Sequence, residues 1–75
     1  FMAYRLSSKL FIQIGRNIRK VREKQNRTQE DVSGEAGIEM SYYSKIERGE
    51  ANPSLEVMYS IIKALHIKSS DILPF

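Results

Sequence analysis

The chain has 75 residues, enough for one small domain with a modest core and too few for a large active-site cleft. It contains no cysteine and one histidine, which excludes disulfides and thiolate chemistry and leaves little scope for a metal site built on imidazole. No apolar run approaches the roughly 20 residues that a membrane-spanning helix needs, so we expect a cytoplasmic protein. The chain also lacks catalytic motifs and a glycine-rich phosphate loop. We therefore expect no enzyme activity, no metal and no cofactor.

The formal net charge of +3 is unevenly distributed. Residues 1–27 hold eight bases against one acid, Glu23, whereas residues 28–75 hold four bases against eight acids. Such asymmetry is typical of a domain with one side that faces a polyanion. A solvated basic helix face explains the charge pattern equally well.

The first expected element is a long amphipathic helix. Residues 1–8 should form an N-terminal arm, and the helix should begin at a cap provided by Ser7 or Ser8 and run to Gln25. Its apolar residues recur at three- and four-residue steps: Leu10, Phe11, Ile14, Ile18 and Val21. Its opposite face is basic: Arg16, Lys20 and Lys24.

Two short helices should follow, separated by a tight turn. Thr28 can cap the first, which has acids in its first turn, and Gly37 supplies the left-handed residue with which a helix often ends. The second should run from Met40 to Arg48 and end at Gly49. Two such helices joined by a short glycine-containing turn can pack at roughly a right angle.

A fourth helix is expected from Leu55 to Leu65, after a cap at Ser54. It carries two apolar strips, which means that it is covered on two sides. Ser69 or Ser70 can cap a fifth, short helix before Pro74. With no alternating strand pattern, the sequence predicts an all-α, compact five-helix domain.

The adjacent tyrosines of the third helix should have different environments. Ile46 marks the inward side, which Tyr43 shares, whereas Tyr42 stands about 100° away on the helix. We therefore expect Tyr43 in the core and Tyr42 in contact with a partner.

The stretch QEDVSGEAGIEMSYYSKIERGEANPSLE resembles the helix-turn-helix signature of the Cro/cI repressor-like (XRE) family. A glutamine at the start of the second helix, the Ala-Gly-Ile turn, Ser-Lys-Ile-Glu-Arg-Gly and Asn-Pro-Ser-Leu-Glu occur together and in order. The similarity extends from about Phe11 to Leu73. It implies a helix-turn-helix at about residues 28–48, in which the third helix enters the major groove of double-stranded DNA.

The resemblance also implies roles for single residues. The positions that match base-reading residues are Met40, Ser41, Tyr42, Ser44 and Lys45. The candidates for contact with the DNA backbone are Gln29, Thr28, Lys20, Lys24, Arg27, Arg48 and Asn52. Arg22 and Glu47 match a pair whose salt bridge is structural and ties the first helix to the end of the third.

Three positions depart from the family pattern. Glu39 stands where a serine or threonine cap is common, and its carboxylate would repel phosphate unless it accepts from a cytosine amino group. Tyr43 replaces a branched aliphatic residue. His66 replaces the usual glycine after the fourth helix, and we interpret it as a helix end rather than a titrating switch.

We expect a sequence-specific transcriptional regulator that binds (pseudo)palindromic operators as a homodimer. The expected dimer surface is Val57, Ile61, Ile67, Ile72 and Leu73, although the protein's own core is an equal alternative for Val57 and Ile61. The narrower prediction is a controller protein of a restriction-modification system. The alternatives are a phage-type repressor and an antitoxin that binds a protein partner. RNA polymerase is a further candidate partner.

Overall fold

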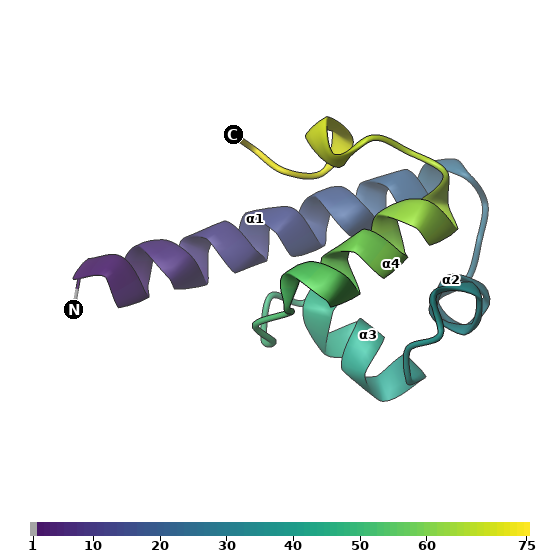
Figure 1. The fold of residues 1–75 in the computed structure, drawn as a ribbon, viewed down its shortest axis with the longest axis horizontal. Coiled ribbons are helices and arrows are strands. Elements are labelled where there is room, and N and C mark those ends of the chain that lie inside the picture. Colours follow the sequence, from purple (N-terminus) through teal and green to yellow (C-terminus); the bar gives the residue numbers. More distant parts are fainter. Residues whose placement is uncertain (1) are drawn as a thin grey trace.

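The computed structural model describes the backbone of residues 2–75 and the side chains of residues 8–75, so that Phe1 lies outside it. Four α-helices follow one another along the chain: α1 (Met2–Lys24), α2 (Gln29–Ala36), α3 (Met40–Glu47) and α4 (Leu55–Leu65) (Figure 1). A 3-10 helix, η1 (Ser69–Asp71), precedes the C-terminus. Residues 2–75 contain no strand, which confirms the all-α fold. Within this range no helix is both long and apolar enough to span a membrane.

The structure differs from the sequence-based prediction at both ends of the chain. α1 already begins at Met2 rather than at Ser7 or Ser8, so the expected N-terminal arm of residues 1–8 is helical from Met2 onward. The expected fifth helix is a single 3-10 turn, and the domain has four α-helices, not five. The turn stops because Ile72, with φ −123°, leaves helical geometry and its side chain is fully buried.

Each of the four helices is followed, within two residues, by a residue in the left-handed region. These residues are Asn26 (φ 57°), Gly37 (φ 73°), Gly49 (φ 76°) and His66 (φ 57°). The N–H of His66 donates to the Lys63 carbonyl, and its Nε2 lies 2.9 Å from Glu35 Oε2. His66 therefore ends α4, as predicted, although a side chain with a Cβ adopts this conformation at a cost.

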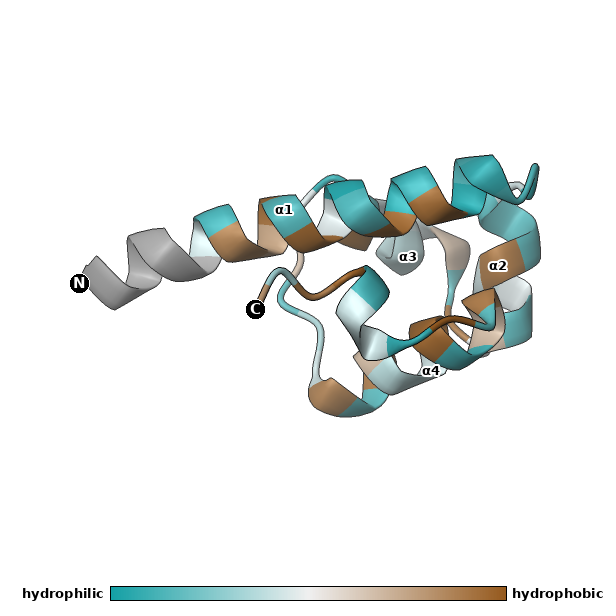
Figure 2. Cartoon of the chain, turned by 90° about the horizontal axis from the view of Figure 1, so that it is seen from above, coloured by the Kyte–Doolittle hydropathy of each residue, from teal (hydrophilic) through white to brown (hydrophobic). Residues whose placement is uncertain are grey.

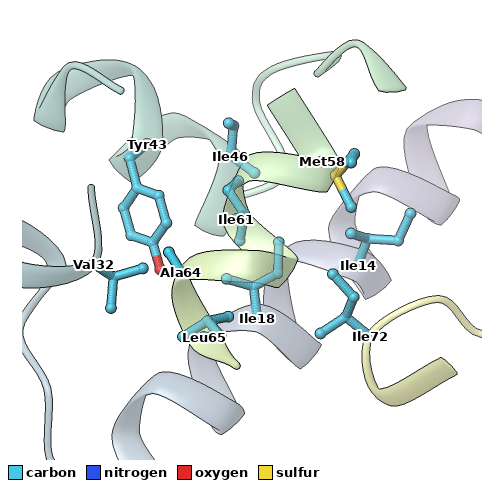
Figure 3. Close-up of a cluster of buried hydrophobic side chains, with 10 residues drawn as sticks. All are labelled: Ile14, Ile18, Val32, Tyr43, Ile46, Met58, Ile61, Ala64, Leu65 and Ile72. Carbon is cyan, nitrogen blue, oxygen red and sulfur yellow. The ribbon is translucent and has the colours of Figure 1, made fainter. Parts of the chain in front are cut away.

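The core gathers side chains from all four helices and from the C-terminal segment. Figure 3 shows Ile14, Met58 and Ile72 at one end of this cluster and Val32 and Tyr43 at the other. Figure 2 shows the apolar residues of α1 on the side that faces the rest of the domain. The buried face of α1 therefore follows the three- and four-residue periodicity of the sequence.

Polar side chains of α1 and of the loop after it hold the C-terminal part of the chain. Asn17 Nδ2 donates to the Ile72 carbonyl at 2.8 Å, and Gln25 Nε2 donates to the Leu65 carbonyl at 2.8 Å. Arg27 Nη1 donates to the Ala64 carbonyl at 2.7 Å. These bonds satisfy carbonyls at the end of α4 and fix the segment that follows against α1.

Gly15 permits the close approach of α1 to the end of α3. A Cβ at this position would collide with the Ile46 carbonyl oxygen and would lie 2.6 Å from the Glu47 carbonyl oxygen. Both obstacles are backbone atoms, which cannot move away as a flexible side chain can. The two helices therefore depend on glycine for their contact.

A buried ion pair lies beside this contact. Arg22 donates to both carboxylate oxygens of Glu47, from Nε at 2.7 Å and from Nη2 at 3.1 Å. Gln29 Nε2 donates to Glu47 Oε1 at 2.9 Å. The Glu47 side chain is 1% exposed and that of Arg22 is 12% exposed. The structural pair expected from the sequence is thus present and joins α1 to α3, and Gln29 adds α2 to the same carboxylate.

The electrostatics of Glu47 follow from these bonds. Burial alone raises the pKa of its carboxyl group, but the hydrogen bonds from Arg22 and Gln29 outweigh burial and hold the pKa below its ordinary value. The nearby Tyr43 hydroxyl is buried and makes no hydrogen bond with the described residues. Its pKa is raised well above the ordinary value by burial first and by the Glu47 carboxylate second.

Gly15→Ala should lower the free energy of unfolding by about 3 kcal/mol, because the added methyl group collides with fixed backbone atoms. Chemical denaturation followed by circular dichroism measures this change. Gly34→Ala is the matched control, since Gly34 also lies inside a helix and a Cβ there meets nothing within 4 Å. It should raise stability by about 0.5–1 kcal/mol. Equal effects at both positions would contradict the close contact at Gly15.

Glu47→Gln should lower the free energy of unfolding by about 3 kcal/mol at pH 6, because it leaves the charge of Arg22 without its partner. A carboxyl group whose pKa is lowered by folding stabilises the native state above its unfolded pKa, roughly 4.3, and this contribution is lost as the pH falls through the folded pKa. The difference between the two proteins should therefore shrink between pH 6 and pH 3. A difference that stays constant over this range would contradict the lowered pKa.

Candidate nucleic-acid interface

The turn between α2 and α3 is built by local hydrogen bonds. The Thr28 hydroxyl accepts from the Asp31 N–H at 3.0 Å and caps α2. At the other end, Gly37 adopts the left-handed conformation and the Ile38 N–H donates to the Ser33 carbonyl at 2.9 Å. In Figure 1 α2 is seen nearly end-on while α3 lies along the plane of the view, so the two helices cross steeply. This is the helix-turn-helix arrangement that the sequence predicts.

The outward side of α3 carries most of the residues expected to read bases. Met40, Ser41 and Lys45 are exposed, and Ser44 is half-buried. Met40 keeps 47% of its surface exposed, so its side chain is open to a ligand. The structure therefore brings four of the five candidates together on a side of α3 that other helices leave open.

The two tyrosines differ, as the helix geometry predicts. Tyr43 is fully buried, which confirms its assignment to the core. Tyr42 is half-buried and packs against the core cluster, so its side chain is less free than we expected. Only part of the Tyr42 side chain is available to a ligand.

Polar groups on this side of α3 bond to one another. Ser41 Oγ donates to Glu39 Oε1 at 2.6 Å, and Arg48 Nη1 donates to Ser44 Oγ at 2.7 Å. Arg48 also lies 3.2 Å from Glu50. Glu39 precedes α3 without accepting a capping bond from it. These exposed contacts are weak and can be exchanged for contacts with a ligand.

Three of the expected backbone-binding residues are already engaged in the fold. Arg27 pairs with Asp31 at 2.7 Å and with Glu35 at 2.6 Å, and its side chain is 16% exposed. Thr28 uses its hydroxyl as a cap, and Gln29 uses its amide to hold Glu47. Hydrogen bonds to α2 and α4 enclose Arg27, so its guanidinium group is not free for a DNA phosphate in this structure.

Lys20 and Lys24 lie away from α3. Both line a surface hollow with Asn17 and with Asp71 of η1. Figure 1 shows η1 on one side of α1 and α3 on the other. The structure does not bring these lysines onto the surface that α3 presents. Arg48 and Asn52, by contrast, are exposed at the end of α3 and in the loop after it.

The expected dimer surface is only partly available. Ile61 and Ile72 are fully buried in the core, which excludes them from contact with a partner. Val57, Ile67 and Leu73 are half-buried. Large apolar residues that are exposed include Leu55 (86%) and Tyr59 (60%) of α4 and Phe75 (83%) at the C-terminus. The C-terminal segment folds back and covers part of the apolar arc of α4.

Sequence reasoning missed the structural role of Gly15. The signal that could have found it is a glycine inside a strongly periodic helix, next to the apolar stripe, where only a close contact justifies its low helix propensity.

Among the described residues no group of three or more acidic or histidine side chains could hold a metal ion.

Three comparisons place the chain among known proteins. It is 34% identical to the control protein C.BamHI of Bacillus amyloliquefaciens over 71 residues, which is 93% of this chain and 88% of that protein. It is 38% identical to the transcriptional regulator ClgR of Mycobacterium tuberculosis over 60 residues, which is 80% of this chain and 54% of that protein. The crystal structure of the restriction-modification controller protein C.AhdI from Aeromonas hydrophila superimposes with a TM-score of 0.80 and 27% identity, and the match covers 83% of this chain and 94% of that one.

The family assignment rests on sequence as well as on shape. Residues 18–72 match the helix-turn-helix family, a range that includes α2, the turn, α3 and α4. Several of the relatives that match, ClgR among them, are named as transcriptional regulators. The chain therefore belongs to the helix-turn-helix family of DNA-binding transcriptional regulators, with the Cro/cI-like fold.

Proposed function

We propose that this protein is a sequence-specific transcriptional regulator that reads the major groove of double-stranded DNA with α3. The observation that carries the proposal is the open side of α3, where Met40, Ser41 and Lys45 stand exposed on a helix that is fixed from behind. A helix of this width fits the major groove of B-form DNA. Family membership supports the same conclusion.

The chemistry of this surface suits base edges. Lys45 can donate to the N7 and O6 acceptors of guanine, the hydroxyls of Ser41 and Ser44 can donate or accept, and Met40 can contact a thymine methyl group. The exposed part of Tyr42 can reach a phosphate or a base edge with its hydroxyl. Arg48 and Asn52 lie where they can bind the DNA backbone.

The backbone N–H groups at the start of α2 are a second anchor. The amides of the first turn of a helix are free to bind a phosphate, and the helix dipole favours the negative charge there. Gln29 is the first residue of α2, and its side chain is fixed on Glu47. We propose that its main-chain N–H, rather than its side-chain amide, contacts the DNA backbone.

A homodimer is the form we propose for operator binding. One helix-turn-helix reads only a few base pairs, whereas two related by a two-fold axis read half-sites about one helical turn apart. Because Ile61 and Ile72 are buried, the dimer surface must use other residues. Leu55 and Tyr59 are one turn apart on the outward side of α4 and are exposed, which supports a contact there.

Among regulators of this family, we propose a controller protein of a restriction-modification system. The similarity to C.BamHI extends over nearly the whole of both chains, whereas the similarity to ClgR covers about half of that protein. The genes beside this one test the proposal directly. A methyltransferase and an endonuclease gene alongside would support a controller, while a toxin gene would indicate an antitoxin instead. An activating controller would also contact RNA polymerase.

Lys45→Ala should weaken binding to a selected palindrome about tenfold and relax the preference at one or two positions, because it removes donors to base edges. Titration of labelled duplexes at 150 mM salt measures both effects. Arg48→Ala is the comparison variant and should weaken the palindrome and a random duplex by the same factor. An equal loss on both duplexes for Lys45→Ala would remove Lys45 from the base-reading residues.

Leu55→Glu should convert the dimer to monomer over the micromolar range without unfolding the domain. Leu55 is 86% exposed and an acid suits the first turn of a helix, so the monomer itself loses little. Sedimentation equilibrium of both proteins measures the change. If the native protein is monomeric even at high micromolar concentration, the homodimer proposal fails. If the native protein and the Leu55→Glu variant are both dimeric, the dimer surface lies elsewhere.

A further inference from the structure

A hollow of about 470 Å³ lies between α1 and the end of α3, and we call it the basic hollow. Its lining residues are Ile12, Arg16, Arg19, Glu47, Arg48 and Glu50. Three of the six are arginines: Arg16 and Arg19 come from α1, and Arg48 caps the end of α3. Arg16 belongs to the basic face expected for α1, but the sequence did not predict that Arg16 and Arg19 lie beside Arg48.

The two acids of the basic hollow are already neutralised. Glu47 is held by both nitrogens of the Arg22 fork, and Glu50 lies 3.2 Å from Arg48. Arg16 makes no ion pair with the residues that the structure describes. Arg19 is paired with Glu23 at 3.0 Å, but both side chains are more than half exposed, so this pair is easily exchanged. The hollow therefore offers guanidinium groups that an anion can recruit.

The position of the basic hollow links it to α3 and α2. Arg48 continues the outward side of α3 and bonds to Ser44 on that side. Glu47 accepts from Gln29, the first residue of α2. The hollow thus adjoins the end of α3, the helix that the proposed function places on DNA, and α1 lines its other side.

The contact at Gly15 explains why α1 contributes here. Because a bare glycine lets the backbone of α1 reach the carbonyls of Ile46 and Glu47, the next residue, Arg16, and Arg19 one turn later are brought beside Arg48. A larger residue at position 15 would hold these arginines away from α3. The arrangement depends on one helix contact rather than on mobile loops.

We infer that the basic hollow binds a phosphodiester group of the DNA backbone, with Arg16 and Arg19 as phosphate ligands beside Arg48. Planar guanidinium groups match phosphate oxygens with paired N–H donors, and such charge-assisted bonds are stronger than neutral ones. This inference rests on the proposed function. It extends the DNA contact from the helix-turn-helix onto the flank of α1.

The lysines of α1 provide matched controls. Lys20 and Lys24 are exposed on the same helix and carry the same charge, but they line the hollow on the side of η1. A general attraction between DNA and a basic protein would involve them as much as Arg16 and Arg19. A phosphate contact confined to the basic hollow would involve Arg16 and Arg19 but neither lysine.

The experiment compares Arg16→Gln, Arg19→Gln, Lys20→Gln and Lys24→Gln in the full chain, with a random duplex and a selected palindrome, between 50 and 300 mM salt. Each arginine variant should lower the slope of log affinity against log salt concentration by about 0.9, the value for one lost phosphate contact, on both duplexes. The lysine variants should keep the native slope. Circular dichroism melting curves should be unchanged, because Arg16, Arg19, Lys20 and Lys24 are all exposed.

Two outcomes would overturn the inference without touching the proposed function. The first is a native slope in the arginine variants, and the second is an equal reduction in the lysine variants, which would indicate unlocalised charge attraction. If the native protein binds the selected palindrome no better than random duplex at 150 mM salt, the proposed function itself fails. The comparison of palindrome with random duplex needs only the native protein. Failure of the proposed function can therefore be distinguished from failure of the inference about the basic hollow.

Discussion

The carboxylate of Glu47 is the constraint on which the remaining geometry depends. A charged group that is 1% exposed is stable in a small domain only if donors surround it, and here Arg22 comes from α1 and Gln29 from α2. The pair therefore fixes three helices relative to one another at the end of α3. Since α3 has only eight residues, this anchor and the buried Tyr43 and Ile46 determine which of its sides remains open.

The same packing divides the basic residues of α1 into separate groups. Arg22 is turned inward, Arg16 and Arg19 lie beside α3, and Lys20 and Lys24 lie toward η1. The net charge of α1 does not reveal this division. Arg16 and Lys20 are four positions apart and so lie near each other on the surface of α1, but one lines the hollow beside α3 and the other lines the hollow beside η1. The elements that pack against α1 therefore decide what each basic residue faces.

Local signals predicted the middle of the domain well. The cap at Thr28, the left-handed Gly37 and the inward Tyr43 depend on residues a few positions apart, so the sequence alone places them correctly. The errors concern contacts between distant segments. The burial of Ile72 and the position of Lys20 depend on how the C-terminal segment returns to α1. The enclosure of Arg27 depends on how α2 and α4 pack beside the loop after α1. No local pattern encodes either arrangement.

The residues with left-handed backbone conformation after the helices affect how this domain can evolve. Two are glycines, but Asn26 and His66 carry a Cβ in a conformation that costs roughly 1 kcal/mol relative to glycine. Replacement of either residue could therefore raise the free energy of unfolding, and both residues lie away from α3. Glycine at either position could offset the destabilisation that new side chains on α3 introduce, so that binding preference and folding can evolve through different parts of the chain.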